Sequence, residues 1–164
     1  MFEMDHGRKQ PAAISAWSLI EPYCDSVSIY DGPEVFLEGF SKLPLPSQHL
    51  FAVHWCNSEI CNGGFYQFFD NSTGILAPEA LEGFRAIGAD ACAELLNRAM
   101  NMFGQPYPRE RDAREDCLAI LCQSGKNHDV CDPFDVLNKP YYAAKDRVEL
   151  AKLMDKYAQQ HAPR

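Results

Sequence analysis

The side chains most able to do chemistry gather in the stretch that begins at Trp55 and reads Trp-Cys-Asn-Ser-Glu-Ile-Cys-Asn-Gly-Gly-Phe-Tyr-Gln-Phe-Phe-Asp-Asn. Glu59 falls one helical turn after Trp55, on the apolar stripe of a predicted helix. Because burying an unpaired carboxylate is costly, this side chain must either find hydrogen-bond donors or remain at the rim of the core. The nearest donors are the backbone amides freed where Gly63 and Gly64 break the helix, since the positive end of the next helix favours a carboxylate. We expect Asn62 to cap this break.

The side-chain amides of Gln67 and Asn71 follow the break, four residues apart, so they can hydrogen-bond each other along one helix face. Together with the aromatic rings of Phe65 and Phe68, they indicate a structural motif built around Glu59. In an alternative interpretation, all the polar side chains of this motif line a pocket around Glu59 and the Gly-Gly turn. Such a pocket would bind a small ligand or carry out acid–base chemistry.

Four residues of metal-binding types occur towards the end of the chain, at Cys117, Cys122, His128 and Cys131. Their spacing departs from the C-x2-C pairs of zinc knuckles. The first two thiols are also five residues apart, which puts them on poorly aligned faces of one helix. We interpret these residues as core and loop side chains, and the sequence predicts no metal and no cofactor.

A cysteine nucleophile is a further alternative, with Cys56 or Cys61 beside His54 as its base. His54 precedes Cys61 by two helical turns, and this separation is too long for a hydrogen bond along a straight helix. We expect His54 to pack beside Trp55 instead, and we predict a protein without catalytic residues.

Helical periodicity of apolar residues extends along nearly the whole chain, and no alternating strand pattern of useful length accompanies it. Pro33 is expected at the first position of one helix, and Ser47 and Asp90 are expected as N-caps of two others. We therefore expect a single compact multi-helix all-α domain over residues 1–164. Its predicted helices cover 33–41, 47–62, 65–71, 78–87, 90–103, a segment between Pro108 and Gly125, and 144–161, after a broken pattern over 12–30.

The chain has 164 residues, of which 46% are hydrophobic and 12% aromatic. This length favours one domain with a core that needs no disulfide, and the composition excludes an intrinsically disordered chain. No apolar run approaches the ~18 residues of a membrane span, and the polar first ten residues do not resemble a signal peptide. The cysteines number seven, an odd count that favours a reducing compartment, so we expect a cytoplasmic protein.

The formal net charge of −8 is unevenly distributed along the chain. Residues 1–104 contain 13 acids and 5 bases, whereas residues 105–164 contain 10 of each. Direct binding to nucleic acid or to a membrane surface needs clustered Lys and Arg, so neither is expected. The asymmetry indicates an acidic face that attracts a basic protein, and the alternative is a solvated surface that keeps the protein soluble. The aromatic content also suggests a homodimer.

The central motif resembles a widespread family of bacterial domains whose best-known member is a DNA-mimic protein. The shared pattern is a Trp, then Glu-x-x-Asn-Gly-Gly-Phe-x-Gln-Phe-Phe-x-Asn-x-x-Gly, then Ala-Pro-Glu-Ala and a helix ending in Ile-Gly-Ala. The resemblance covers residues 14–104 and is far more specific than one Gly-Gly pair. It is carried here by Trp55, Glu59, residues 62–65, residues 67–69, Asn71, Gly74, residues 77–80 and residues 87–89.

The resemblance implies a compact all-α fold that presents acidic surface to a DNA-binding regulator in place of DNA. No base occurs between Lys9 and Lys42, and carboxylates one helical turn apart lie about 5–6 Å from each other, a spacing that could imitate a row of phosphates. Two further acids begin a helix, where the helix dipole already favours them. The predicted partner-binding residues are Asp25, Asp31, Glu34, Glu38, Glu79 and Glu82.

Overall fold

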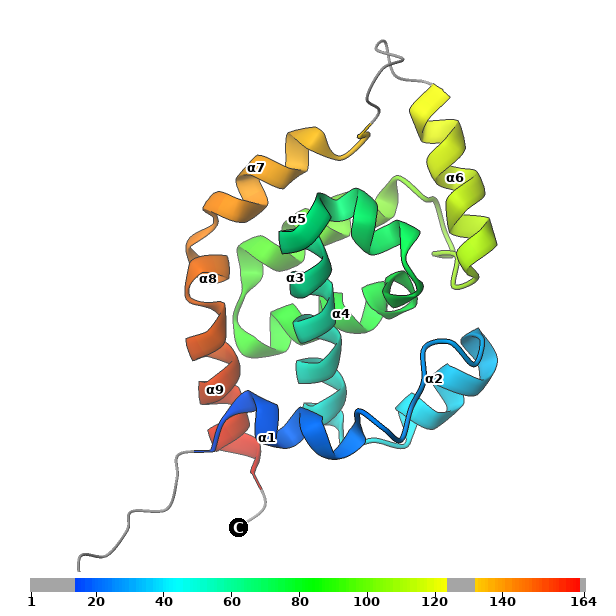
Figure 1. Ribbon diagram of the computed structural model, residues 1–164. Helices are drawn as coiled ribbons and strands as arrows, with labels where there is room; N and C mark the ends of the chain where they lie inside the picture. Colours follow the sequence, from blue (N-terminus) through cyan, green and yellow to red (C-terminus); the bar gives the residue numbers. More distant parts are fainter. Residues whose placement is uncertain (1–13, 124–131, 163–164) are drawn as a thin grey trace, which may run out of the picture.

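The computed structural model describes residues 14–123 and 132–162, and within these ranges the chain is all-α, as predicted, with no strand (Figure 1). Two short 3-10 helices, η1 and η2, accompany the α-helices. In chain order the elements are α1 (Ala16–Ile20), η1 (Glu21–Tyr23), α2 (Pro33–Ser41), α3 (Leu45–Asp70), η2 (Ser72–Leu76), α4 (Ala77–Ile87), α5 (Asp90–Asn101), α6 (Arg111–Gln123), α7 (Asp135–Ala143), α8 (Lys145–Val148) and α9 (Leu150–His161).

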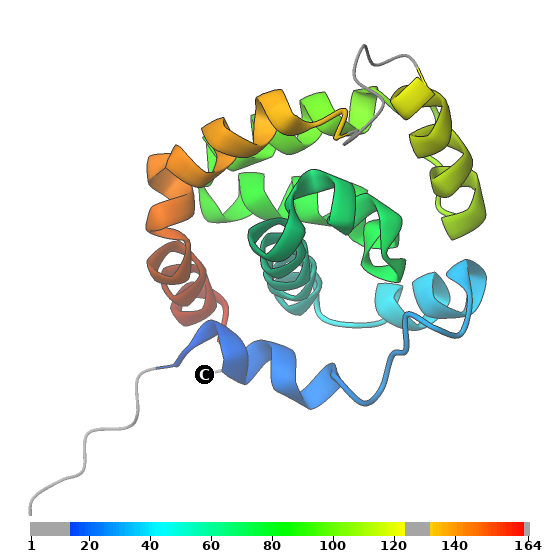
Figure 2. The same cartoon turned by 45° about the horizontal axis from the view of Figure 1, so that its top comes forward.

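Helix α3 lies at the centre of the molecule. Figure 2 shows it close to end-on, with α1, α2, α6, α7, α8 and α9 arranged around it. It contacts α4 and η2 most extensively, and it also touches α1, α6, α7 and α9. Its apolar side chains therefore supply the middle of the core, where Leu50, Cys56, Ile60 and Phe68 are fully buried.

The long helix α3 consists of two helical segments joined at a kink. Gly63 and Gly64 leave helical geometry there, with φ/ψ of −149°/27° and 75°/−178°. A side chain at Gly64 would be strained by the positive φ and would also meet the Asn138 amide at 2.8 Å. The break predicted from the Gly-Gly pair is therefore confirmed, and it turns Phe65 and Phe69 into the core beside α7.

Several helix boundaries differ from the prediction. Helix α3 begins at Leu45, because Pro44 is extended and Pro46 suits the first turn, so Ser47 is a buried residue inside the helix instead of its cap. Asp90 is the first residue of α5, and Ala89 occupies the cap position. The predicted helix over 144–161 is divided into α8 and α9 at Glu149, and the expected stop at Gly125 lies outside the described residues.

No helix in the described part of the chain is long and apolar enough to cross a membrane.

Candidate functional site

The Glu59 carboxylate is the centre of a polar network on the concave side of the α3 kink. Its Oε2 accepts hydrogen bonds from Gln67 Nε2 at 2.7 Å and from Asn71 Nδ2 at 2.9 Å. Its Oε1 accepts one from Thr73 Oγ1 at 3.2 Å. Since α3 folds back at the glycines, one carboxylate holds the end of the second helical segment and the start of η2.

These contacts correct three expectations about the motif. Glu59 is bound by side chains instead of the free amides at the break. Gln67 and Asn71 both donate to Glu59 and do not bond each other, because the shared acceptor lies between them. Asn62 is exposed, and the Phe65 amide is instead capped by Asn138 Oδ1 at 3.0 Å. The cap comes from α7, far away in the sequence, so local spacing could not reveal it.

The aromatic residues of the motif have different surroundings. Phe65 and Phe68 are completely buried, and the Phe65 ring meets Tyr141 edge-on at 5.3 Å. Trp55 is only partly buried and packs against Phe51 and His54, with ring centroids 6.3 and 5.3 Å away. The predicted packing of His54 beside Trp55 is confirmed, and burial lowers the pKa of the His54 imidazole below its ordinary value.

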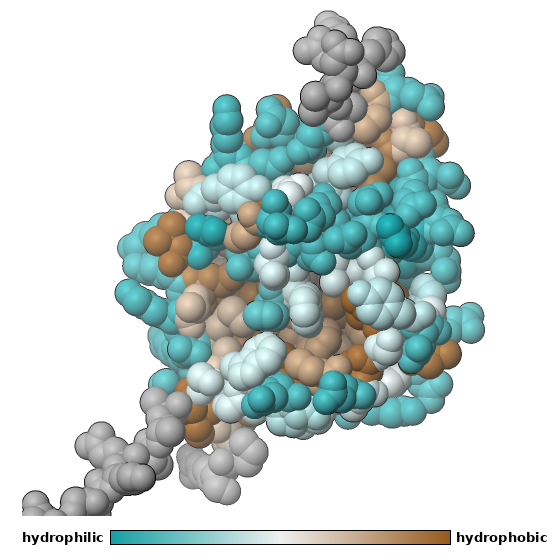
Figure 3. Space-filling view, viewed as in Figure 1, coloured by the Kyte–Doolittle hydropathy of each residue, from teal (hydrophilic) through white to brown (hydrophobic). Residues whose placement is uncertain are grey.

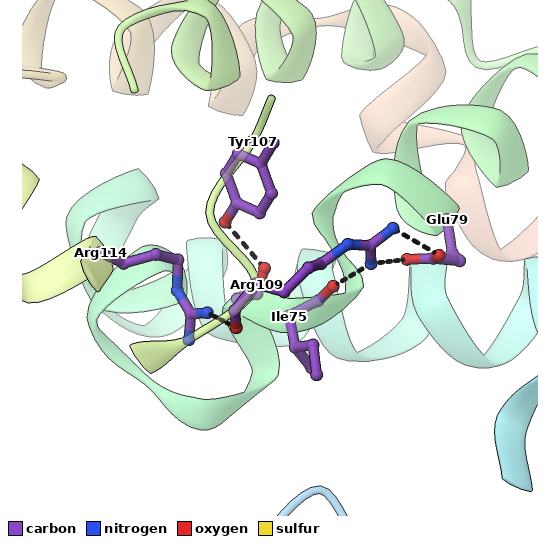
Figure 4. A network of polar contacts seen from close by, with 6 residues as sticks. Ile75, Glu79, Tyr107, Arg109 and Arg114 are labelled. Atoms are coloured by element: carbon purple, nitrogen blue, oxygen red, sulfur yellow. Dashed lines mark hydrogen bonds and ion pairs between the residues drawn. The ribbon is translucent and has the colours of Figure 1, made fainter. Parts of the chain in front are cut away.

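Sequence reasoning did not assign any role to two arginines, Arg109 and Arg114, that bind the chain where α3 ends and η2 follows; Figure 4 shows both side chains. Arg114 is buried, and its guanidinium donates to the carbonyls of Phe69, Asn71 and Arg109 at 2.9, 2.9 and 2.5 Å. Phe69 lies in the last turn of α3 and Asn71 is its C-cap residue, so the cation lies at the negative end of a helix. Burial lowers the pKa of Arg114. The sequence signal for this group is the run of three arginines at positions 109–114.

Glu79 is engaged by this arginine group. Arg109 binds it with two nitrogens, at 2.7 and 2.9 Å, and also donates to the Ile75 carbonyl at 2.6 Å (Figure 4). Glu82, which lies on α4 like Glu79, forms an ion pair with Arg85 at 2.8 Å. Both acids are neutralised within the described structure, so neither contributes free negative charge to the surface.

The remaining four predicted partner-binding acids lie together, on what we call the N-terminal unit, residues 14–42, which comprises α1, η1, the following loop and α2. Asp25, Asp31, Glu34 and Glu38 are all exposed. Val27 of the loop packs against α2 next to Gly39, where an added side chain would approach it to 3.3 Å. Glu38 forms an i,i+4 ion pair with Lys42 at 2.7 Å, and this pair lowers the pKa of its carboxyl.

A cleft of about 380 Å³ lies between α3 and the loop of the N-terminal unit that follows η1. Glu59 and Thr73 line it on the α3 and η2 side, together with the rings of Phe51 and Trp55. The opposite wall is the loop that follows η1 and includes Asp25. Figure 3 shows apolar surface exposed in a hollow over α3, rimmed by hydrophilic side chains. The structure therefore places Glu59 both in a structural network and at the wall of a cleft.

The thiols considered for chemistry are dispersed. Cys56 is buried, which raises its pKa well above the ordinary thiol value, whereas Cys61 is exposed and accepts a hydrogen bond from Arg147 at 3.1 Å. Of the four residues with zinc-ligand character, His128 and Cys131 lie outside the described residues. Within the described ranges, no group of three or more His, Cys, Asp or Glu side chains is arranged to hold a metal ion.

Fold and site together define an all-α protein whose kinked central helix is held by one carboxylate and a group of arginines. The chain belongs to the DMP19-like protein family, which matches residues 41–161, well over half of its length. The family is that of DNA mimic protein 19. No curated protein and no solved structure matches the chain. Almost all of the N-terminal unit precedes the matched residues, whereas the motif-based resemblance covers residues 14–104.

Proposed function

We propose that this protein is a non-catalytic, acidic protein-binding module that occupies the DNA-binding surface of a basic regulator. Membership of the DMP19-like family supports the DNA-mimic part of this proposal. The observation that carries it is the charge of the N-terminal unit. Five acids of that unit, Glu21, Asp25, Asp31, Glu34 and Glu38, are exposed, and its single base, Lys42, is paired with Glu38.

Four of these five carboxylates have no ion-pair partner among the described residues. Uncompensated surface charge attracts an oppositely charged protein over a Debye length of about 8 Å at physiological salt. A surface that binds DNA is rich in Lys and Arg, so it is the complement of this unit. The proposal therefore places Asp31 and Glu34 in the interface, whereas Glu79 and Glu82 are already paired with arginines of the chain itself.

The experiment begins with affinity capture from the native cell, and the captured DNA-binding protein is then purified. Its affinity is measured for the wild-type chain and for the double variant Asp31→Asn plus Glu34→Gln, over a range of salt concentrations. We expect the variant to bind about tenfold more weakly at low salt and to show a flatter salt dependence. A DNA site of the captured protein should also compete with the wild-type chain.

The matched control is the double variant Glu94→Gln plus Glu149→Gln. It removes the same net charge from two exposed positions elsewhere on the molecule, on α5 and between α8 and α9. We expect it to bind almost as tightly as the wild type. Equal weakening by both double variants would mean that only the overall charge matters, and simultaneous binding of DNA and this chain to the captured protein would refute DNA mimicry.

A further inference from the structure

The cleft between α3 and the loop of the N-terminal unit has a negatively charged lining without a compensating positive charge. Among the described residues, its lining includes two carboxylates, Asp25 and Glu59, and no Lys, Arg or His. Glu59 forms no ion pair with any described residue, and its three hydrogen bonds all come from the neutral donors Gln67, Asn71 and Thr73. Neutral donors hold a carboxylate in position without cancelling its charge, so this wall of the cleft attracts a cation.

The hydrogen-bonding capacity of Glu59 is not exhausted. An ionised carboxylate has about four acceptor positions, two on each oxygen. Oε2 uses two of them, on Gln67 and Asn71, whereas Oε1 uses one, on Thr73. Thr73 and Glu59 line the cleft together, so the remaining acceptor position is on the oxygen that they share. One N–H of an incoming cation can take it.

Aromatic and aliphatic walls decide which cation fits. Phe51 and Trp55 stand on one side, and Val27, Ile29 and Tyr30 on the other. A guanidinium is planar and more weakly hydrated than an ammonium, and it stacks on aromatic faces, so it gains more from such walls than a lysine does. The aliphatic side chains suit the methylene stem of the same residue. Asp25 adds a second, exposed carboxylate to the lining.

We propose that this cleft binds one arginine side chain of the basic protein partner, with the guanidinium against Glu59 and Trp55. This inference rests on the proposed function, because it takes the occupant to belong to that partner. It extends the proposal from a charged surface to a defined anchor point. The free acids Asp31 and Glu34 do not line the cleft, so anchor and surface can be tested separately.

The first test uses Nα-acetyl-arginine amide as the probe. Trp55 and Trp17 are the two tryptophans of the chain, so a Trp17→Phe background assigns the fluorescence to the cleft. We expect saturable quenching with a Kd on the order of millimolar, as befits a single side chain. The lysine analogue should bind more weakly, and the uncharged citrulline analogue should not saturate. Absence of saturation with the arginine probe, or equal binding of the citrulline analogue, would overturn the inference.

The second test changes the cleft. Glu59→Gln removes the charge but preserves the shape, and we expect it to weaken the arginine probe about tenfold or more. If this variant does not fold, Asp25→Asn is tested in its place. We expect it to weaken binding of the arginine probe about twofold. Glu21→Gln is the matched control, because Glu21 is an exposed acid of the same unit that does not line the cleft. If the arginine probe binds a folded Glu59→Gln variant as tightly as the wild type, the cleft is excluded as its binding site. The same conclusion follows from unchanged binding to Asp25→Asn where that variant is the one used.

The third test separates this inference from the proposed function. Arginines in the captured partner are replaced by methionine one at a time and combined with Glu59→Gln in double-mutant cycles. We expect one arginine to couple to Glu59 and none of the others. If Asp31→Asn plus Glu34→Gln weakens the partner but no arginine couples to Glu59, the acidic module stands and the anchor is refuted. If the arginine probe binds and no basic partner is found, the proposed function is refuted. The assignment of the cleft to an arginine of that partner is then refuted as well.

Discussion

Glu59 shows how a single carboxylate holds two parts of the chain together. Its replacement by alanine leaves three donors without their acceptor, and one of them, Thr73, is buried. We expect Glu59→Ala to lower the free energy of unfolding by about 2–3 kcal/mol, because buried donors that lose their partner retain a desolvation penalty. Urea denaturation followed by circular dichroism measures this loss.

The amide variant is the matched control for that prediction. In Glu59→Gln the side-chain carbonyl can take the place of Oε2 towards Gln67 and Asn71, and the new NH2 can donate to the Thr73 hydroxyl, which is also an acceptor. All three contacts are then retained, and we expect a loss below about 1 kcal/mol. Equal losses in the two variants would show that the charge of Glu59, and not its hydrogen-bonding pattern, stabilises the kink.

His54 makes stability dependent on pH. Burial lowers the pKa of its imidazole from 6.5, so the unfolded chain binds a proton at a higher pH than the folded chain does. The contribution of the neutral His54 imidazole to the free energy of unfolding is therefore lost as the pH falls below about 6.5 towards the pKa of the folded state. The folded protein becomes less stable over this range. His54→Phe keeps an aromatic ring between Trp17 and Trp55 and removes this titration. We expect a shallower decline of the urea midpoint between about pH 7 and 5 in that variant.

At the residue scale, the sequence identified Glu59 as a carboxylate that requires donors, but it did not identify the donors. Helical spacing relates a residue to neighbours three or four positions away. The actual donors follow Glu59 by 8, 12 and 14 residues, and only the reversal at the kink brings them near. The Phe69 and Asn71 carbonyls that bind Arg114 and the cap on Phe65 are more distant still, so no local pattern could predict these contacts.

At the scale of elements, the kink in α3 depends on α7. Asn138 accepts from the Phe65 amide at 3.0 Å and donates to Asp132 Oδ2 at 2.7 Å. We expect Asn138→Ala to lower the free energy of unfolding by about 1–2 kcal/mol, because it removes the cap of a helical segment. Asn62→Ala is the matched control at the same kink, since Asn62 is exposed and the Phe65 amide is bound by Asn138 instead. Comparable losses in the two variants, measured by urea denaturation, would contradict the assignment of the cap to α7.

Helix α7 was not predicted from the sequence, and neither was the short 3-10 helix η2. Helix α7 is nine residues long, carries Pro140 inside it and exposes Val136, so its pattern does not indicate a helix. Tertiary contacts form it nevertheless: Leu137 and Tyr141 are buried against the core, and Asn138 is bound to the kink. The long helices, in contrast, are predicted because their apolar residues recur along one face of the helix. The same face packs into the core, so the sequence pattern and the tertiary contacts agree.

For the whole molecule, the N-terminal unit is part of the same core as the residues that match the family. Ala16 donates its amide to Asp155 of α9 at 2.8 Å, and the Phe40 ring meets Phe51 of α3 at 5.6 Å. The unit therefore packs on α3, forms one wall of the cleft and carries four exposed acids that have no ion-pair partner among the described residues. In the function proposed above, this unit both completes the core and faces the basic partner.

A truncation that deletes residues 1–40 tests this dependence. Ile20, Phe36 and Phe40 are each no more than 2% exposed, and burial of each contributes about 1.5–3 kcal/mol. Their sum is comparable to the net stability of a whole domain, about 5–15 kcal/mol. We therefore expect the truncated chain to lose its cooperative thermal transition in circular dichroism, although it retains the family-matched residues. Deletion of residues 1–13 removes none of these contacts and should leave the transition in place. A cooperative transition in the longer deletion would show that the matched residues form the folding unit by themselves.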